Sequence, residues 1–218
     1  MSDLGGLSPA RFHELLGPSD WRVTSRGAEA LYRGESLAQL AEFVPEIVAA
    51  AEACDVAPDV DLRPTAIAVR VGFDGMTLPA GVVEFATTVS AAAVRLRPDP
   101  GAIQAVDVFV AQHEDADTRP FWAAVLGYVE QGDADAVDPL RRGPGIAVNP
   151  IGNGKRGRGR THLDVHLPAE AARARVDAAL AAGGRLVDDS HAPAWWTLAS
   201  PDNHGVDIAS WIDTWDGS

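Results

Sequence analysis

The sequence predicts an α+β protein made of two domains, and three observations lead to this expectation. The N-terminal half has the order helix, strands, helix, strand, helix. The run Arg97-Pro98-Asp99-Pro100-Gly101 follows, and its two prolines and glycine suit neither a helix interior nor a strand interior. The C-terminal half then has a strand, a helix and further strands twice, as an internal repeat of roughly 55 residues. We therefore expect domains at residues 1–97 and 102–218.

Local signals mark the first elements. Ser8 and Pro9 form an N-cap and first-turn pair for a short helix that ends near Gly17-Pro18. Two short strands are expected between Trp21 and Tyr32, around a turn at Arg26-Gly27.

A longer helix is predicted after Ser36, because apolar residues recur at spacings of three and four. They are Leu37, Leu40, Phe43, Val44, Ile47, Val48 and Ala51. Pro45 interrupts this stripe, and an interior proline costs about 3 kcal/mol, so the helix is expected to kink or to restart there. A strand at 65–73 and a third helix from Thr77 and Pro79 complete the first domain.

The C-terminal domain is predicted as two modules, about 103–152 and 160–213. The first has a strand at 105–111 and a helix capped by Thr118 that ends at Gly127. The second repeats this order with a strand from 161, a helix from Pro168, the pair Gly183-Gly184, and strands at 185–188, 195–199 and 206–211.

Composition and charge limit the partners. The 46% hydrophobic and 22% charged residues are typical of a globular protein. A net charge of -13, from 31 acidic and 18 basic side chains, repels nucleic acid and anionic membranes, so neither is expected as a partner.

Cysteine usage and the N-terminus favour the cytoplasm. Cys54 is the only cysteine, so the chain cannot form an internal disulfide, which fits a reducing compartment. The first residues lack a basic region followed by an apolar run, and no window reaches the roughly 18 apolar residues of a membrane span. We expect a cytoplasmic protein.

Four motifs in the C-terminal half carry a family resemblance. They are Phe121-Trp122-Ala123-Ala124-Val125-Leu126-Gly127, His162-Leu163-Asp164-Val165, Ala182-Gly183-Gly184 and Ser200-Pro201-Asp202-Asn203-His204. In this order they resemble the glyoxalase-like members of the vicinal oxygen chelate superfamily, over residues 103–213. The resemblance implies paired βαβββ modules around a cleft, with metal ligands on the first and last strands of each module in the members that use a metal.

The same resemblance assigns candidate metal ligands to this sequence. His162 matches the ligand position on the first strand of the second module, and Asp207 stands where the family usually has glutamate. Asp107 and Asn149 are the approximate equivalents in the first module. Imidazole and carboxylate suit a divalent metal acting as a Lewis acid in a lyase, isomerase or dioxygenase. The alternative is that His162 points into the cleft of a protein without metal.

Four residues are predicted to bind the small-molecule ligand: Trp122, Trp195, Trp196 and Arg160. Trp195 and Trp196 alternate on one strand, so one is expected to face the cleft and the other the helix layer. Arg160 ends the basic, glycine-rich stretch 154–160, which joins the modules and is a candidate for attracting an anionic substrate.

The N-terminal half resembles pterin-4a-carbinolamine dehydratase over residues 7–93. The matching features are Leu7-Ser8, Trp21, Ala49-Ala50-Ala51-Glu52, Pro58-Asp59, Arg63 and Gly75-Met76-Thr77. Val56 and Ala57 stand where that enzyme has paired histidines, and Phe73 or Asp74 stands where it has a third. Acid-base catalysis needs a group that titrates near neutrality, so this domain is expected to keep the fold and lose the chemistry.

Three functions therefore remain open. The first is a metal-assisted lyase, isomerase or dioxygenase, and the second is a metal-free protein that sequesters an aromatic or apolar small molecule. The third is 4a-hydroxytetrahydrobiopterin dehydratase activity, or pterin binding, in the N-terminal half. Both resemblances imply a homo-oligomer.

Overall fold

The computed structural model describes residues 6–112, 119–132, 134–150, 161–199 and 205–210. Contacts divide the chain into two compact units, an N-terminal unit that extends to Ile103 and a C-terminal unit, Gln104–Ser210. The chain is mixed α+β, as predicted. Among the described residues, no helix combines the length and apolar character that crossing a membrane requires.

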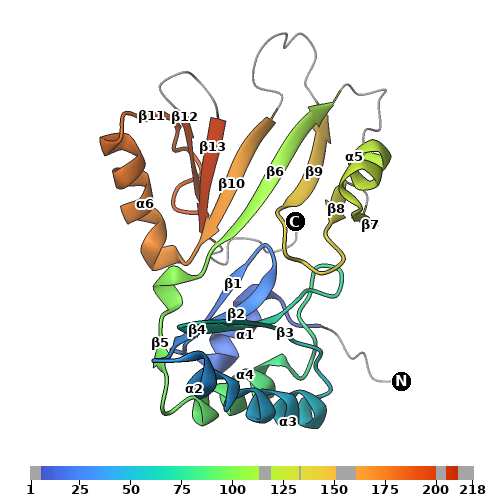
Figure 1. Cartoon of the computed structure of the whole chain (residues 1–218). Helices are drawn as coiled ribbons and strands as arrows, with labels where there is room; N and C mark the ends of the chain where they lie inside the picture. Colours follow the sequence, from blue (N-terminus) through green and yellow to red (C-terminus); the bar gives the residue numbers. More distant parts are fainter. Residues whose placement is uncertain (1–5, 113–118, 133, 151–160, 200–204, 211–218) are drawn as a thin grey trace. The chain divides into compact units, whose positions relative to one another are not determined.

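The N-terminal unit has a five-stranded antiparallel sheet with helices (Figure 1). Its elements are α1 (Pro9–Leu16), β1 (Trp21–Thr24), β2 (Gly27–Arg33), α2 (Leu37–Ala41), α3 (Val44–Cys54), β3 (Asp59–Arg63), β4 (Ala66–Val71), α4 (Val82–Ala92), β5 (Arg97–Pro98) and a 3-10 turn, Pro100–Ala102. The strand order is β1-β2-β4-β3, and β5 pairs with β2.

Most local signals have their predicted effect in this unit. The hydroxyl of Ser8 accepts a hydrogen bond from the N–H of Arg11, and that of Ser36 accepts one from Gln39 (both 3.2 Å). The predicted interruption near Pro45 is a restart, because α2 ends at Ala41 and α3 carries Pro45 in its first turn.

Two features of this unit differ from the sequence-based expectation. The strand β3 was not among the predicted elements. The predicted linker is not free, since Arg97 and Pro98 pair with β2. Pairing with β2 therefore makes Arg97 and Pro98 a short strand, although their own sequence favours irregular structure.

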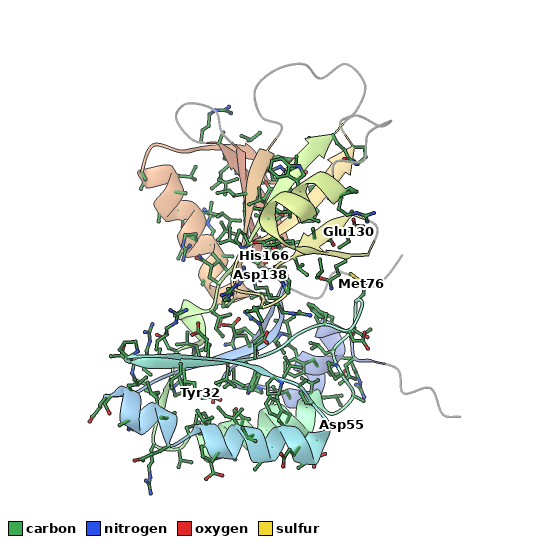
Figure 2. All side chains as sticks on the ribbon, turned by 45° about the vertical axis from the view of Figure 1, so that its right-hand side comes forward. Tyr32, Asp55, Met76, Glu130, Asp138 and His166 are labelled. Atoms are coloured by element: carbon green, nitrogen blue, oxygen red, sulfur yellow. The ribbon has the colours of Figure 1, made fainter. Side chains whose placement is uncertain are left out.

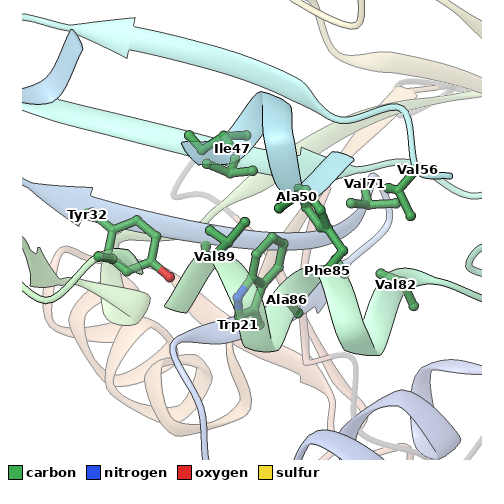
Figure 3. Packing of buried hydrophobic residues seen from close by; sticks show 14 of the residues in the cluster. Trp21, Tyr32, Ile47, Ala50, Val56, Val71, Val82, Phe85, Ala86 and Val89 are labelled. Carbon is green, nitrogen blue, oxygen red and sulfur yellow. The ribbon is translucent and has the colours of Figure 1, made fainter. Parts of the chain in front are cut away.

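One face of this sheet forms the core with α1, α3 and α4. Alternate side chains of β1, β2 and β4 point toward the helices, where they are buried. The largest side chains without exposed surface include Trp21, Tyr32, Phe12, Phe85, Leu40 and Ile47. Figure 3 shows Trp21 and Phe85 side by side in this core.

The described residues of the C-terminal unit form an eight-stranded sheet with two helices. Its elements are β6 (Ala105–Gln112), α5 (Arg119–Leu126), β7 (Val129–Gln131), β8 (Asp135–Val137), β9 (Gly145–Pro150), β10 (Thr161–Leu167), α6 (Ala169–Ala181), β11 (Arg185–Asp188), β12 (Trp195–Ala199) and β13 (Gly205–Ser210). The strand order is β11-β12-β13-β10-β6-β9-β8-β7. Figure 1 shows β10 and β6 at the centre of this sheet.

The order contains the predicted repeat as two βαβββ modules. In each module the first strand pairs in parallel with the last, β6 with β9 and β10 with β13. The central strands β6 and β10 pair antiparallel and join the modules. α6 packs on Val165 and Leu167 of β10, and Trp122 of α5 packs beside Val108 and Val110 of β6. The register places these strand residues on one face, so both helices cover the same face of the sheet.

Candidate metal centre

A row of three carboxylates crosses the face of the C-terminal sheet that α5 and α6 leave uncovered. Asp164 of β10 is paired in register with Asp107 of β6 on one side and with Asp207 of β13 on the other. Residues paired in this way point to the same face of a sheet. The three aspartates therefore lie on adjacent central strands, on the face opposite the helices.

His162 completes a cluster with two of these carboxylates. It precedes Asp164 by two residues and therefore points to the same face. Its Nε2 lies 3.2 Å from Asp164 Oδ1 and 3.8 Å from Asp207 Oδ2. One ligand atom from each of these three residues lies within 4.8 Å of the others.

The electrostatics of the cluster favour an added positive charge. Burial raises the pKa of Asp207, and the nearby Asp164 carboxylate raises it further, while a hydrogen bond from Thr197 and the proximity of His162 lower it. The interaction with Asp164 raises the pKa of His162 against the opposing effect of burial. Two close carboxylates beside one imidazole are thus best balanced by a proton on the imidazole or by a bound cation.

The donor atoms fit a divalent metal ion. Asp164 Oδ1 is buried and has no hydrogen-bond partner among the described residues. This oxygen lies 3.2 Å from His162 Nε2. A buried carboxylate oxygen without a partner is costly, whereas imidazole and carboxylate together are ligands that divalent first-row metals accept. His162, Asp164 and Asp207 are therefore the residues suited to hold such an ion.

The other two predicted ligands lie outside this cluster. Asp107 contacts His166, with Nε2 and Oδ2 3.2 Å apart, and its Oδ1 accepts a hydrogen bond from the N–H of Gly145 (3.1 Å). A Cβ atom on Gly145 would lie 2.6 Å from Asp107 Oδ1, so a larger residue there would displace the end of this carboxylate. Asn149 is exposed near the end of β9, in register with Ala111.

The residues predicted to bind a ligand separate onto two faces of the sheet. Trp195 lies on the same face as Asp207, is 37% exposed, and stacks on His191 with ring centroids 4.0 Å apart. Trp196 is buried in the core beneath α6, and Trp122 packs beside Val110, Ile146 and Val148 beneath α5. Arg160 lies outside the described residues.

Asp164 and His166 are the site residues that the sequence interpretation missed. The stretch 161–167 alternates polar and apolar residues, with His162, Asp164 and His166 at every second position. In a strand this spacing places all three side chains on one face. The pattern was therefore sufficient to group Asp164 with His162.

The fold and the cluster define a class of protein: paired βαβββ modules whose central strands present a His/Asp/Asp set. Residues 107–209 match the model of a family described as glyoxalase-like domain, which supports the predicted vicinal oxygen chelate resemblance of this part of the chain. The match does not extend to the N-terminal unit, whose resemblance to the dehydratase stays a prediction. No curated protein matches the chain.

Proposed function

We propose that the C-terminal unit is a small-molecule-binding domain of the vicinal oxygen chelate type that holds one divalent metal ion through His162, Asp164 and Asp207. The observation that carries the proposal is the convergence of three ligand atoms within 4.8 Å, including the buried Asp164 Oδ1 without a hydrogen-bond partner. Bound there, such an ion would supply Lewis-acid chemistry toward a substrate oxygen, as in a lyase, isomerase or dioxygenase.

The chain's own residues orient this set. Thr197 of β12 is paired in register with Asp207 and lowers the pKa of its carboxyl group. Phe109, paired with His162 across β6 and β10, stacks on the imidazole with centroids 5.0 Å apart and planes 20° apart. All three proposed ligands come from the second module. Asp107 of the first module is not among them, and its carboxylate contacts His166 instead.

Metal content tests the proposal directly. The protein is expected to retain about one equivalent of a divalent metal after incubation with Mn²⁺, Fe²⁺, Co²⁺ or Zn²⁺ and removal of excess ion, as measured by elemental analysis. The His162→Ala variant is expected to retain none, while His191→Ala, which changes an exposed histidine outside the cluster, retains the wild-type amount. Absence of metal from the reconstituted wild-type protein would refute the metal assignment.

The second candidate function is metal-free sequestration of an aromatic or apolar molecule, and the exposure of Trp195 on the same face as Asp207 favours it. Aromatic compounds would then quench tryptophan fluorescence in the presence of EDTA. Trp195→Ala would abolish this quenching and Trp122→Phe would not. Quenching that depends on added metal would instead support the metal-assisted function.

Dehydratase activity of the N-terminal unit is the least favoured candidate. Val56 and Ala57 stand at the positions of the paired histidines, and no histidine lies between His13 and His113 in the sequence. We expect a carbinolamine dehydration assay to give the uncatalysed rate. If the wild-type protein accelerates the reaction and the variants Glu52→Gln and Asp55→Asn accelerate it equally, the activity would have to come from other groups.

Phe109 is expected to position the metal-binding imidazole. An aromatic stack contributes about 0.5–1.5 kcal/mol beyond the area it buries, so Phe109→Leu should weaken metal binding roughly 2- to 10-fold. Phe109→Tyr keeps the stack and should keep the affinity. Isothermal titration calorimetry with the same metal distinguishes the variants, and equal losses in both would show that the stacking itself has no role.

The titration of His162 provides a pH-dependent test. In the metal-free protein its pKa should lie above the ordinary value of 6.5, because the Asp164 carboxylate favours the protonated ring. The folded state then holds this proton more tightly than the unfolded state. The resulting stabilisation is fully present below pH 6.5 and is lost as the pH rises through the raised pKa. An NMR titration should show a raised midpoint in the wild type and a lower one in Asp164→Asn.

A further inference from the structure

A second candidate site lies in the N-terminal unit, whereas the proposed metal centre belongs to the C-terminal unit. The end of α3, the loop that follows it and β3 enclose a surface pocket of about 390 Å³. This volume lies within the range of small-molecule sites. Its lining includes Ile47, which is fully buried, and the side chains of Val48 and Val60, which are 49% and 39% exposed. Covering the exposed apolar surface of a concave site with a ligand is favourable, because it removes that surface from water.

The ionisable residues that line this pocket are both acidic. Glu52 lies in the last turn of α3, and Asp55 follows the helix with a φ of 53°. Figure 2 shows Asp55 at this end of α3. The carbonyl groups at a helix C-terminus add partial negative charge, so the helix end and both carboxylates favour a cation at the same edge of the pocket.

These two carboxylates differ from their neighbours on β3. Asp59 forms an ion pair with Arg70 (3.0 Å), and Asp61 forms one with Arg63 (2.8 Å). Neither Glu52 nor Asp55 has an ion-pair partner among the described residues. The negative charge of β3 is thus neutralised within the protein, whereas the charge at the pocket edge is not.

We infer that this pocket binds a small organic cation, namely a protonated amine carried on an apolar body about the size of one aromatic ring. The apolar body would cover Val48 and Val60, and the ammonium group would lie beside Glu52 and Asp55. The lining contains no basic, imidazole, hydroxyl or amide side chain that would pair with a carboxylate or with the polar edge of a neutral heterocycle. The inference concerns a different unit from the proposed metal centre and does not depend on it.

Three ligands of matched shape test the charge preference. Phenethylamine, 2-phenylethanol and 3-phenylpropionate have the same ring and similar chains, but their end groups are cationic, neutral and anionic. By NMR chemical-shift titration of the α3 and β3 amides, the amine should bind at least about 10-fold more tightly than the alcohol, and the carboxylate should not bind. Amine affinity should fall as salt increases, since the pocket edge is open to solvent.

Substitutions at the pocket edge complete the test. The double variant Glu52→Gln/Asp55→Asn should bind the amine no better than the alcohol, and asparagine tolerates the left-handed backbone of position 55. Glu46→Gln removes an exposed acid of α3 that does not line the pocket, and it should leave the amine affinity unchanged. Glu52→Lys/Asp55→Asn should reverse the preference toward 3-phenylpropionate. Equal binding of the amine and the carboxylate by the wild type, or shifts confined to residues outside the pocket, would overturn the inference.

Discussion

Replacement of Asp164 by asparagine is expected to lower the affinity of the C-terminal unit for a divalent metal ion by about 100-fold or more. Loss of residues that merely support a metal ligand already costs about 10- to 100-fold, and Asp164 is proposed to be a ligand. Asparagine keeps the size of the side chain but replaces the charged carboxylate with a neutral amide. The affected atom is the buried Oδ1 that lies 3.2 Å from His162 Nε2. Competition with a chromogenic chelator measures the change.

Asp107→Asn is the matched control for this variant. Asp107 is paired in register with Asp164 and lies in the same carboxylate row, but its contacts are with His166 and Gly145. We expect its metal affinity to fall by about 10-fold at most, at the low end of the range for residues that only support a ligand. Far-ultraviolet circular dichroism of both metal-free variants establishes that they are folded. Equal losses in the two variants would contradict the assignment of Asp164 as a ligand.

The second large effect is expected in the core of the N-terminal unit. Phe85→Ala should lower the free energy of unfolding by about 3–5 kcal/mol, because truncation of a buried aromatic side chain loses burial and leaves a cavity. Phe85 has no exposed surface and packs edge-to-face against Trp21, with centroids 5.8 Å apart (Figure 3). Trp21 is itself anchored, since its indole N–H donates to the hydroxyl of Ser90 (3.2 Å).

Native-state hydrogen exchange of the β2 and β4 amides measures this loss, because it reports the opening of this unit separately from the rest of the chain. Thr87→Ala, on the exposed side of the same helix, serves as the control and should change stability by no more than about 0.5 kcal/mol. A loss below about 1.5 kcal/mol for Phe85→Ala would show that the site repacks. The cavity would then be smaller than the structure implies.

The elements were predictable wherever their signals are local. Ser8 and Ser36 cap helices as expected, and Gly127, with a φ of 68°, ends α5. β3 was missed because its residues are mostly exposed and its partner β4 lies later in the chain. Such a strand is stabilised mainly by pairing with its neighbour, so its own sequence is a weak predictor of it.

The candidate site was predictable only in the part that local sequence determines. His162 was identified from the resemblance, and the alternation of 161–167 contained the information that Asp164 shares its face. Asp107 and Asn149 were placed with an uncertainty of a residue or two, because the register between β6, β9 and β10 depends on contacts between distant segments. A shift of one residue would move a side chain to the opposite face of the sheet.

The sequence by itself determined the α+β class, the repeated strand–helix–strands order and the alternation that separates the two faces of each strand, since these depend on short-range spacing. Only the tertiary structure decided which face carries function. The helices α5 and α6 cover one face and bury Trp196, so Trp195 and the carboxylates lie on the other. The pairing of β10 with β13 then brought Asp207 to His162 and Asp164, because backbone hydrogen bonds between strands set the positions of side chains that are distant in sequence.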